Sequence, residues 1–324
     1  MSQDQTKKEA LFNEVKGSLF EYLMARRLSQ LAGDELKFLE SLDKNYLNIL
    51  TQQDRMVRQF YPEMLTFLNQ VSEDSANGLI NFLGEIPRSP QLRGKFGTNH
   101  EADLLLESGR GIIPLSLKLN KKNSFVNTKS GGIKSFFDHY FSFINSKIQQ
   151  DFNQLVDQEF IRMSYELHAL NDMEYPGDYS RWIQNGKSEL PGELPIEERS
   201  ILKSFYARIA VEMHKILKEA HQARPVEFFA SLPALMGFST PEILQLVYFH
   251  DFKSKGNGFV SIHSYGEVLS SLEKARLLPF NQTSSVEISL GEWALQIRVK
   301  PMNKFTTTAI KINCSVKFKQ SEVV

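Results

Sequence analysis

Two short segments of alternating apolar residues flank a Gly-Arg-Gly turn between residues 101 and 120. Side chains of a strand point alternately to its two faces, so the leucines of LSLKLN share one face, and Ser116 and Lys118 share the other. The two glycines permit a tight reversal of the chain. The stretch therefore predicts a β-hairpin with one apolar face and one polar face, on which Asp103 lies across from Lys118.

The hairpin leads into a run of residues without any acid. From residue 109 to 137 there are six Lys or Arg and no Asp or Glu, although the whole chain has 38 of each sign. A solvated face ordinarily mixes both signs, whereas cations among Asn, Ser and Thr donors suit phosphate oxygens. The run therefore predicts DNA contacts from Lys121, Lys122, Asn123, Asn127, Lys129 and Lys134.

A second acid-free run covers residues 293–320 and holds six cations. Its alternation predicts strands with one basic face and one apolar face. Hydroxyl and amide side chains at the tip PMNKFTTT are types that read base edges or hold phosphates. We expect DNA contacts from Arg298, Lys300, Asn303 and Lys304. The alternative is an edge strand that lysines protect from aggregation.

The order of hydrophobic patterns predicts a mixed α/β (α+β) fold. Helical spacing dominates 10–32, 34–61, 136–170 and 201–221, while β-type patterns dominate from residue 244 onward. The Gly and Pro content of GEIPRSPQLRGKFGTN argues against regular structure there. We expect a single domain with a central mixed sheet flanked by helices. Its parts are a helical N-terminal part 8–90, a catalytic hairpin 101–120, a helical insert 136–235 and a β-rich C-terminal DNA-binding part 244–320.

Composition excludes several classes of function. Cys314 is the single cysteine, so no intrachain disulfide or thiolate metal cluster can form. No window approaches the ~20 apolar residues of a membrane span, and the N-terminus lacks the apolar core of a signal peptide. We expect a cytoplasmic protein without membrane contact. No GxGxxG or P-loop follows a strand, which argues against a nucleotide cofactor, and the histidines do not form a zinc pattern.

The hairpin suits metal-assisted cleavage of a phosphodiester. A carboxylate such as Asp103 binds a hard cation such as Mg²⁺, and an ammonium such as that of Lys118 orients the attacking water and offsets charge on the phosphate. A second carboxylate is normally needed. The same residues can also form an ordinary solvated hairpin edge.

On these residues the sequence resembles the PD-(D/E)XK nuclease superfamily. Asp103 matches the first acid, with Ala102 where the pattern has proline, and the (D/E)-x-K half matches Ser116-Leu117-Lys118 without its acid. The resemblance implies a restriction-endonuclease-like core and a second metal ligand from a helix. Glu21 in KGSLFEY is that candidate, with Glu101 as its competitor, and Ser116 would support the metal shell. The plain alternatives are a helical ion pair for Glu21 and a salt bridge to an Arg for Glu101.

The layout is similar to that of restriction enzymes of the HaeIII type. This resemblance rests on YFHDFKSK, FVSIHSYGEV and AIKINCSVKF, together with Ser-x-Lys. It implies a type II restriction endonuclease that cuts both strands of double-stranded DNA, most simply as a homodimer. Two alternatives stay open. One is a non-catalytic DNA-binding or scaffold protein with a degenerate nuclease fold, and the other is a structural helical protein without nucleic acid.

Overall fold

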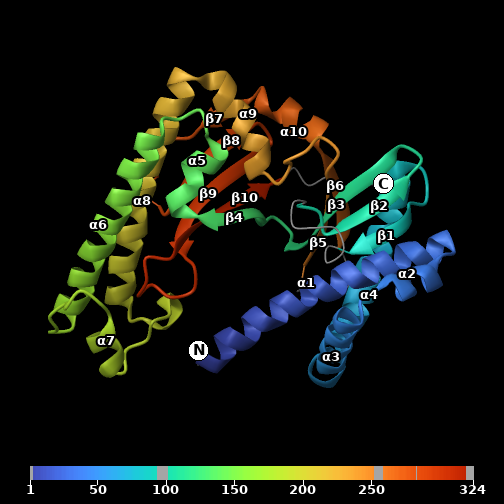
Figure 1. Cartoon of the computed structure of the whole chain (residues 1–324), viewed down its shortest axis with the longest axis horizontal. Coiled ribbons are helices and arrows are strands. Elements are labelled where there is room, and N and C mark those ends of the chain that lie inside the picture. Colours follow the sequence, from blue (N-terminus) through green and yellow to red (C-terminus); the bar gives the residue numbers. More distant parts are fainter. Residues whose placement is uncertain (1–2, 93–100, 252–257, 282, 319–324) are drawn as a thin grey trace. The chain divides into compact units, whose positions relative to one another are not determined.

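The structure, a computed structural model, describes residues 3–92, 101–251, 258–281 and 283–318 (Figure 1). The fold is mixed α/β with two five-stranded sheets. The chain forms two compact units: it builds the first with residues up to 124 and 238–268, and the second with 125–237 and 269–318. The range 244–320, which we grouped as one C-terminal part, is thus shared between the two units.

Four helices open the first unit: α1 (Gln3–Ala32), α2 (Glu35–Ser41), α3 (Lys44–Phe60) and α4 (Pro62–Leu83). Gly33 ends α1 with a left-handed φ of 76°. The sequence predicted one continuous helical pattern from Asp34 to Tyr61, and this prediction was wrong. Asp43 interrupts it, because its carboxylate accepts hydrogen bonds from the backbone N–H groups of Asn45 and Tyr46 and starts α3.

The first sheet has the strand order β1-β2-β3-β5-β6. The predicted hairpin is confirmed, since β2 (Leu104–Ser108) pairs antiparallel with β3 (Gly111–Lys121). β5 (Leu244–His250) pairs parallel with β3, and β6 (Phe259–Ser264) pairs antiparallel with β5. A loop was expected in the segment that forms β1 (Arg88–Leu92). Its Pro90 is compatible with a strand here because β1 lies at the edge of the sheet. Residues 84–87 form neither helix nor strand, as expected, and residues 93–99 of the expected loop lie outside the described residues.

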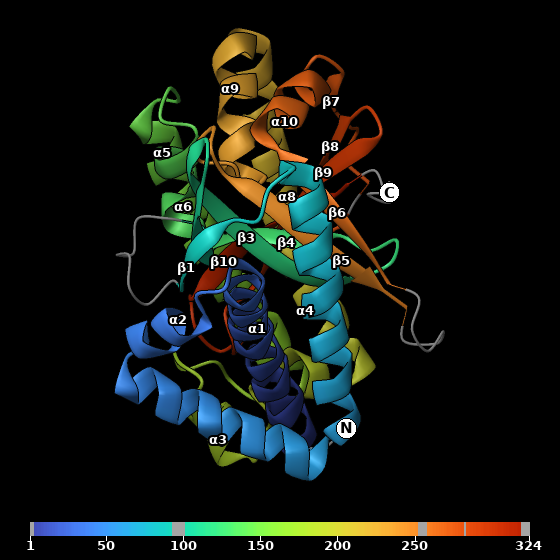
Figure 2. The same cartoon turned by 90° about the vertical axis from the view of Figure 1, so that its right-hand side faces the viewer.

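One face of this sheet is apolar and packs against the helices (Figure 2). Leu104, Leu115 and Leu117 belong to one buried core with residues of α1 and α4. The hydrophobic spacing of α1 explains this contact, because Leu19, Phe20 and Met24 are all buried. Helices therefore cover the leucine face, and Ser116 and Lys118 point to the other side of the sheet.

The second unit contains an antiparallel sheet of order β4-β10-β9-β8-β7. Its strands are β4 (Val126–Gly132), β7 (Ala275–Leu277), β8 (Ser285–Leu290), β9 (Trp293–Pro301) and β10 (Ile310–Lys317). The β-type patterns of the C-terminal part are confirmed. No strand was predicted over β4, whose Asn, Lys and Gly residues are unfavourable in strands; its pairing with β10 explains how so polar a segment forms a strand.

Two long helices dominate this unit, α6 (Ser146–Leu170) and α8 (Ile196–Ala223), which lie side by side (Figure 1). α8 also packs against β8 and β9. The shorter α-helices of this unit are α5 (Phe136–Tyr140), α7 (Ser180–Gln184) and α9 (Pro225–Leu235). α10 (Tyr265–Leu272) follows β6, and its residues are divided between the two units. Within the described ranges, no helix is both long enough and apolar enough to cross a bilayer.

Candidate functional site

Asp103 lies immediately before β2, with its carboxylate turned toward β3. The Asp103 side chain is 7 % exposed, and its backbone N–H donates to Leu115 O at 2.8 Å. Asp103 Oδ2 accepts hydrogen bonds from Leu117 N at 2.7 Å and from Ser116 Oγ at 3.2 Å. Lys118 Nζ lies 3.5 Å from the same oxygen. The structure thus brings three predicted site residues, Asp103, Ser116 and Lys118, into contact.

The hairpin register explains this convergence. Leu104 pairs with Leu115, so the residues next to them, Asp103 and Ser116, also lie opposite one another on the other face. Lys118 shares the face of Ser116 because it lies two positions further along the strand, with only Leu117 between them. The Lys118 side chain is 27 % exposed, so its ammonium can meet solvent or a ligand while Asp103 stays buried.

Further polar side chains lie on the same face of the neighbouring strands, at positions that the sequence analysis did not select as site residues. Together with Asp103 and Ser116 they form a polar row across the sheet. Gln245 of β5 pairs with Ser116, and His263 of β6 pairs with Gln245; both side chains are buried. Ser261 Oγ and His263 Nε2 are 3.0 Å apart. Burial lowers the pKa of His263 to about 4, so the ring is neutral near pH 7. Only the parallel pairing of β3 with β5 brings this row together, and that pairing has no sequence signal of its own.

Glu21 lies on α1, the helix that packs against the leucine face. Burial is the main cause that raises the pKa of Tyr46 of α3 to about 12, and the nearby carboxylate of Glu21 adds to this effect. Glu101 lies two residues before Asp103 and is half-buried. Among the residues that the structure describes, no three His, Cys, Asp or Glu side chains form a group that could hold a metal. The three predicted acids are therefore not gathered into one cluster.

The donor set nevertheless fits one kind of cation. Mg²⁺ takes oxygen ligands, and one or two carboxylates usually bind it together with water and substrate phosphates. Asp103 offers a buried carboxylate, and Ser116 offers a hydroxyl beside it. Glu101 lies two residues before Asp103 and is therefore nearer to it along the chain than Glu21 is. These residues fit Mg²⁺ that completes its shell from solvent and phosphate.

Cations also gather where β3 ends. Lys121 pairs with His250 of β5, and Lys122 donates its backbone N–H to His250 O at 3.0 Å. Burial, together with the nearby charges of Lys16 and Lys121, lowers the pKa of His250 to about 4. The Lys122 ammonium lies 5.3 Å from the centroid of the Phe259 ring. The exposed Asn123 follows with a left-handed φ of 60°, which is typical of Asn in a turn.

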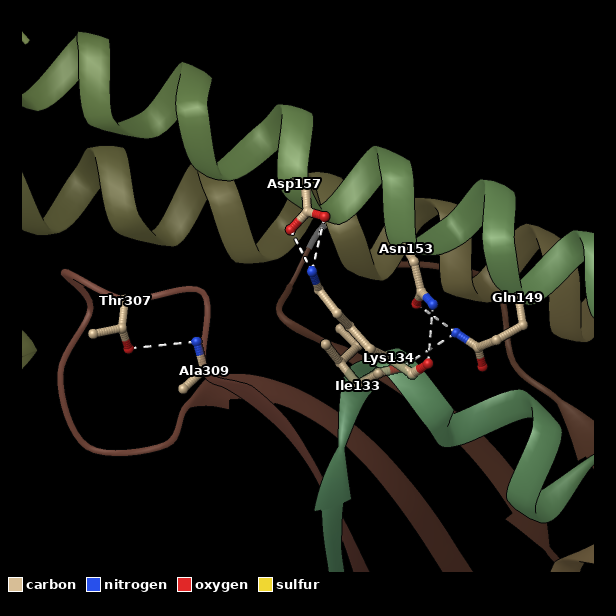
Figure 3. Close-up of polar contacts among 7 residues, drawn as sticks. All are labelled: Ile133, Lys134, Gln149, Asn153, Asp157, Thr307 and Ala309. Atoms are coloured by element: carbon tan, nitrogen blue, oxygen red, sulfur yellow. Dashed lines mark hydrogen bonds and ion pairs between the residues drawn. The ribbon is translucent and has the colours of Figure 1, made fainter. Parts of the chain in front are cut away.

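Two of the predicted DNA contacts of the second unit have carboxylate partners. Lys134 Nζ lies 2.6 Å and 2.8 Å from the two carboxylate oxygens of Asp157 of α6 (Figure 3). In the same view Asn153 Nδ2 donates to Lys134 O at 3.0 Å. Lys304 forms an ion pair with Glu189. Both lysines therefore connect parts of the second unit.

The other predicted contacts of this unit do not all share one face. Arg298 and Lys300 lie on the same face of β9, and Asn127 of β4 hydrogen-bonds to β10 residues of that face. Lys129 pairs with Cys314 instead, whose side chain belongs to the buried apolar face of β10. Asn303 is exposed in the turn between β9 and β10. The second sheet thus has a polar face to which three predicted residues contribute.

Comparison with known proteins gives no further assignment. The chain matches no family model, no curated protein and no solved structure. Its function must therefore be inferred from the side chains that the fold brings together.

Proposed function

We propose that the chain is a Mg²⁺-dependent type II restriction endonuclease of the PD-(D/E)XK kind, which hydrolyses phosphodiester bonds of double-stranded DNA at a specific site. The observation on which this proposal depends is the contact of Lys118 Nζ with Asp103 Oδ2 at 3.5 Å on the polar face of a mixed sheet. Helices against the other face of that sheet agree with the core that the resemblance implies.

Each residue has a chemical role in this proposal. Asp103, with Glu101 as the favoured second acid and Glu21 as the alternative, would hold Mg²⁺. When bound, Mg²⁺ supplies Lewis acidity toward the phosphate and toward water. Ser116 and the Leu117 N–H fix the Asp103 carboxylate by donating to Oδ2. The Lys118 ammonium orients the attacking water and offsets the negative charge that develops on the phosphate.

The alternative is a DNA-binding protein that has the fold without the chemistry. One observation favours it: Ser116 occupies the position of the acid in the (D/E)-x-K pattern, and it donates to Asp103 instead of adding a second carboxylate. Such a protein would bind DNA in the presence of Mg²⁺ and leave it intact. Cleavage of DNA in the presence of Mg²⁺ therefore distinguishes the nuclease from the non-catalytic protein.

Cleavage of supercoiled and phage DNA with Mg²⁺, repeated with EDTA, tests the proposal. We expect discrete fragments from the native chain with Mg²⁺, and a loss of rate of about a hundredfold or more for Asp103→Asn and for Lys118→Ala. Glu107→Gln is a matched control, because Glu107 is an exposed carboxylate of β2. Intact DNA in every reaction, with DNA binding retained, would instead establish the non-catalytic function.

A homodimer and a cytoplasmic location remain predictions. Two-fold symmetry would match a palindromic site and place one hydrolytic site on each strand. Sedimentation of the chain with and without a DNA fragment tests the dimer. A mass of one chain in both cases would contradict it.

A further inference from the structure

The second sheet has a polar face to which three strands contribute. On β10 this face consists of Lys311, Asn313 and Ser315, and on β9 it consists of Lys300, Arg298 and Gln296. Lys311 pairs with Lys300, and Asn313 pairs with Arg298, as antiparallel neighbours. The opposite face is apolar, with Leu295, Ile297 and Val299 buried on β9. We call the first of these faces, with Asn127 and Ser130 of β4, the polar face of the second sheet.

Like charges meet at one end of this face. Lys300 and Lys311 lie directly across from one another, an arrangement that destabilises a sheet in the absence of an anion. Burial lowers the pKa of Lys300, and the charges of Lys311 and Arg298 lower it further, so the three cations act on one another. Glu287 lies across from Gln296 and accepts a hydrogen bond from its amide at 2.9 Å, one row away from Arg298. A polyanion placed over this end would relieve the repulsion.

Next to these cations, amide and hydroxyl side chains hold one another in place through hydrogen bonds. Ser130 Oγ donates to Asn313 Oδ1 at 3.0 Å. Asn127 Oδ1 accepts from Ser315 Oγ at 2.8 Å and from Asn313 Nδ2 at 3.4 Å. Because two donors hold its oxygen, the amide of Asn127 is oriented with its NH₂ group turned away from β10, and the residue is exposed. This geometry presents a preorganised donor next to the cations.

We infer that the polar face of the second sheet binds the sugar-phosphate backbone of duplex DNA, with Lys300, Lys311 and Arg298 on phosphates and the Asn127 amide as a neighbouring donor. The inference rests on the proposed function for the identity of the polyanion. It assigns Lys311 to DNA binding and leaves Lys134 and Lys304 outside the contact, since both have carboxylate partners. Cations and amide donors are the groups that position a protein on a duplex.

A binding assay without hydrolysis tests this assignment. The full chain is titrated with a fluorescein-labelled duplex of mixed sequence in EDTA over a series of salt concentrations. The variant Lys300→Met with Lys311→Met removes both charges and keeps the side-chain length. We expect weaker binding and a smaller slope of log Kobs against log[salt], by about 1.8, because each lost phosphate contact removes about 0.9. Lys134→Met is the matched control and should keep the slope of the native chain.

Two further measurements separate binding from folding and from catalysis. Urea unfolding of the double variant should show a stability equal to or above that of the native chain, because the variant removes a like-charge pair. Asp103→Asn should keep the full salt slope even where it no longer cleaves. A folded double variant with unchanged affinity and slope would overturn the inference, and so would tighter binding of single-stranded than of duplex DNA by the native chain. Loss of cleavage alone would bear only on the proposed function.

Discussion

Lys118 Nζ lies 3.5 Å from Asp103 Oδ2, an oxygen that also accepts from two neighbours of Lys118 on the same strand. One carboxylate oxygen thus interacts with three consecutive residues of β3. Because all three contacts come from one strand, the register of the hairpin alone decides whether the site forms. A shift of one residue would turn Ser116 and Lys118 to the leucine face.

Asp103 should therefore contribute to stability as well as to any chemistry. Replacing it with Ala leaves the buried Leu117 N–H without its acceptor, and we expect a loss of about 1–3 kcal/mol in the free energy of unfolding. Asp103→Asn keeps an acceptor oxygen and should cost less. Urea denaturation measures both, with the exposed Glu107→Gln as control. Equal costs for the Ala and Asn variants would show that the hydrogen bond is not the stabilising element.

Two helical glycines should respond in opposite ways to alanine. A Cβ at Gly78 of α4 would lie 3.0 Å from Val260 Cγ1 of β6, whereas a Cβ at Gly17 of α1 meets nothing within 4 Å. Gly17→Ala should stabilise the protein by about 0.5–1 kcal/mol through helix propensity alone. At Gly78 the clash opposes the same gain, so Gly78→Ala should be less stable than Gly17→Ala by about 1 kcal/mol or more. Thermal or urea unfolding compares the two variants. A Gly78→Ala protein as stable as the Gly17→Ala protein would mean that α4 lies farther from β6 than described.

His263 should contribute a loss of stability on mild acidification, in the same pH range as His250, whose pKa is also about 4. Its folded pKa of about 4 lies below the ordinary value of 6.5, so the unfolded chain takes up the proton first as the pH falls. The stability present above about pH 6.5 is lost progressively down to about pH 4, by up to about 3 kcal/mol. His263→Gln should flatten this part of the pH profile. If the pH profile is equally steep with and without His263, other groups cause the loss of stability in acid.

Cys314 should be nearly inert in the folded protein. Its side chain is 1 % exposed, and burial raises the pKa of the thiol to about 12, against a small opposite effect of Lys129. At pH 8, a thiol with a pKa of about 12 instead of 9.0 has a thiolate fraction that is lower by about a thousandfold. The reaction with an aromatic disulfide reagent at pH 8 should therefore be at least about that much slower in buffer than in urea. Rapid labelling of the native protein would contradict this burial.

The hairpin was predictable because its information is local. Alternation and two turn glycines are sufficient to predict β2 and β3, and the same periods predict α1, α8, β9 and β10. β1 and β4 were not predictable, because Pro90 and the polar residues 127–132 oppose a strand on propensity. Each is a strand because a partner, β2 or β10, supplies the hydrogen bonds.

The candidate site was also predictable only where its residues lie close together in the sequence. Asp103, Ser116 and Lys118 lie on one hairpin, so their contact follows from register. The position of Glu21 depends on which face of the sheet α1 covers, and the positions of Gln245 and His263 depend on a strand pair that joins distant parts of the chain. Ion pairs such as those of Lys134 and Lys304 depend likewise on tertiary partners, and charge counts along the sequence cannot reveal them.

The parallel pairing of β3 with β5 has a consequence for biosynthesis. Residues 125–237, the longer of the two segments of the second unit, lie between these two strands. A ribosome that adds about 10 residues per second delivers β5 on the order of ten seconds after β3. Throughout that interval the nascent chain presents the hydrogen-bonding edge of β3, beside leucines that have yet to be covered completely. Slower elongation should therefore lower the soluble yield of this protein, and a holdase chaperone bound near β3 should restore it.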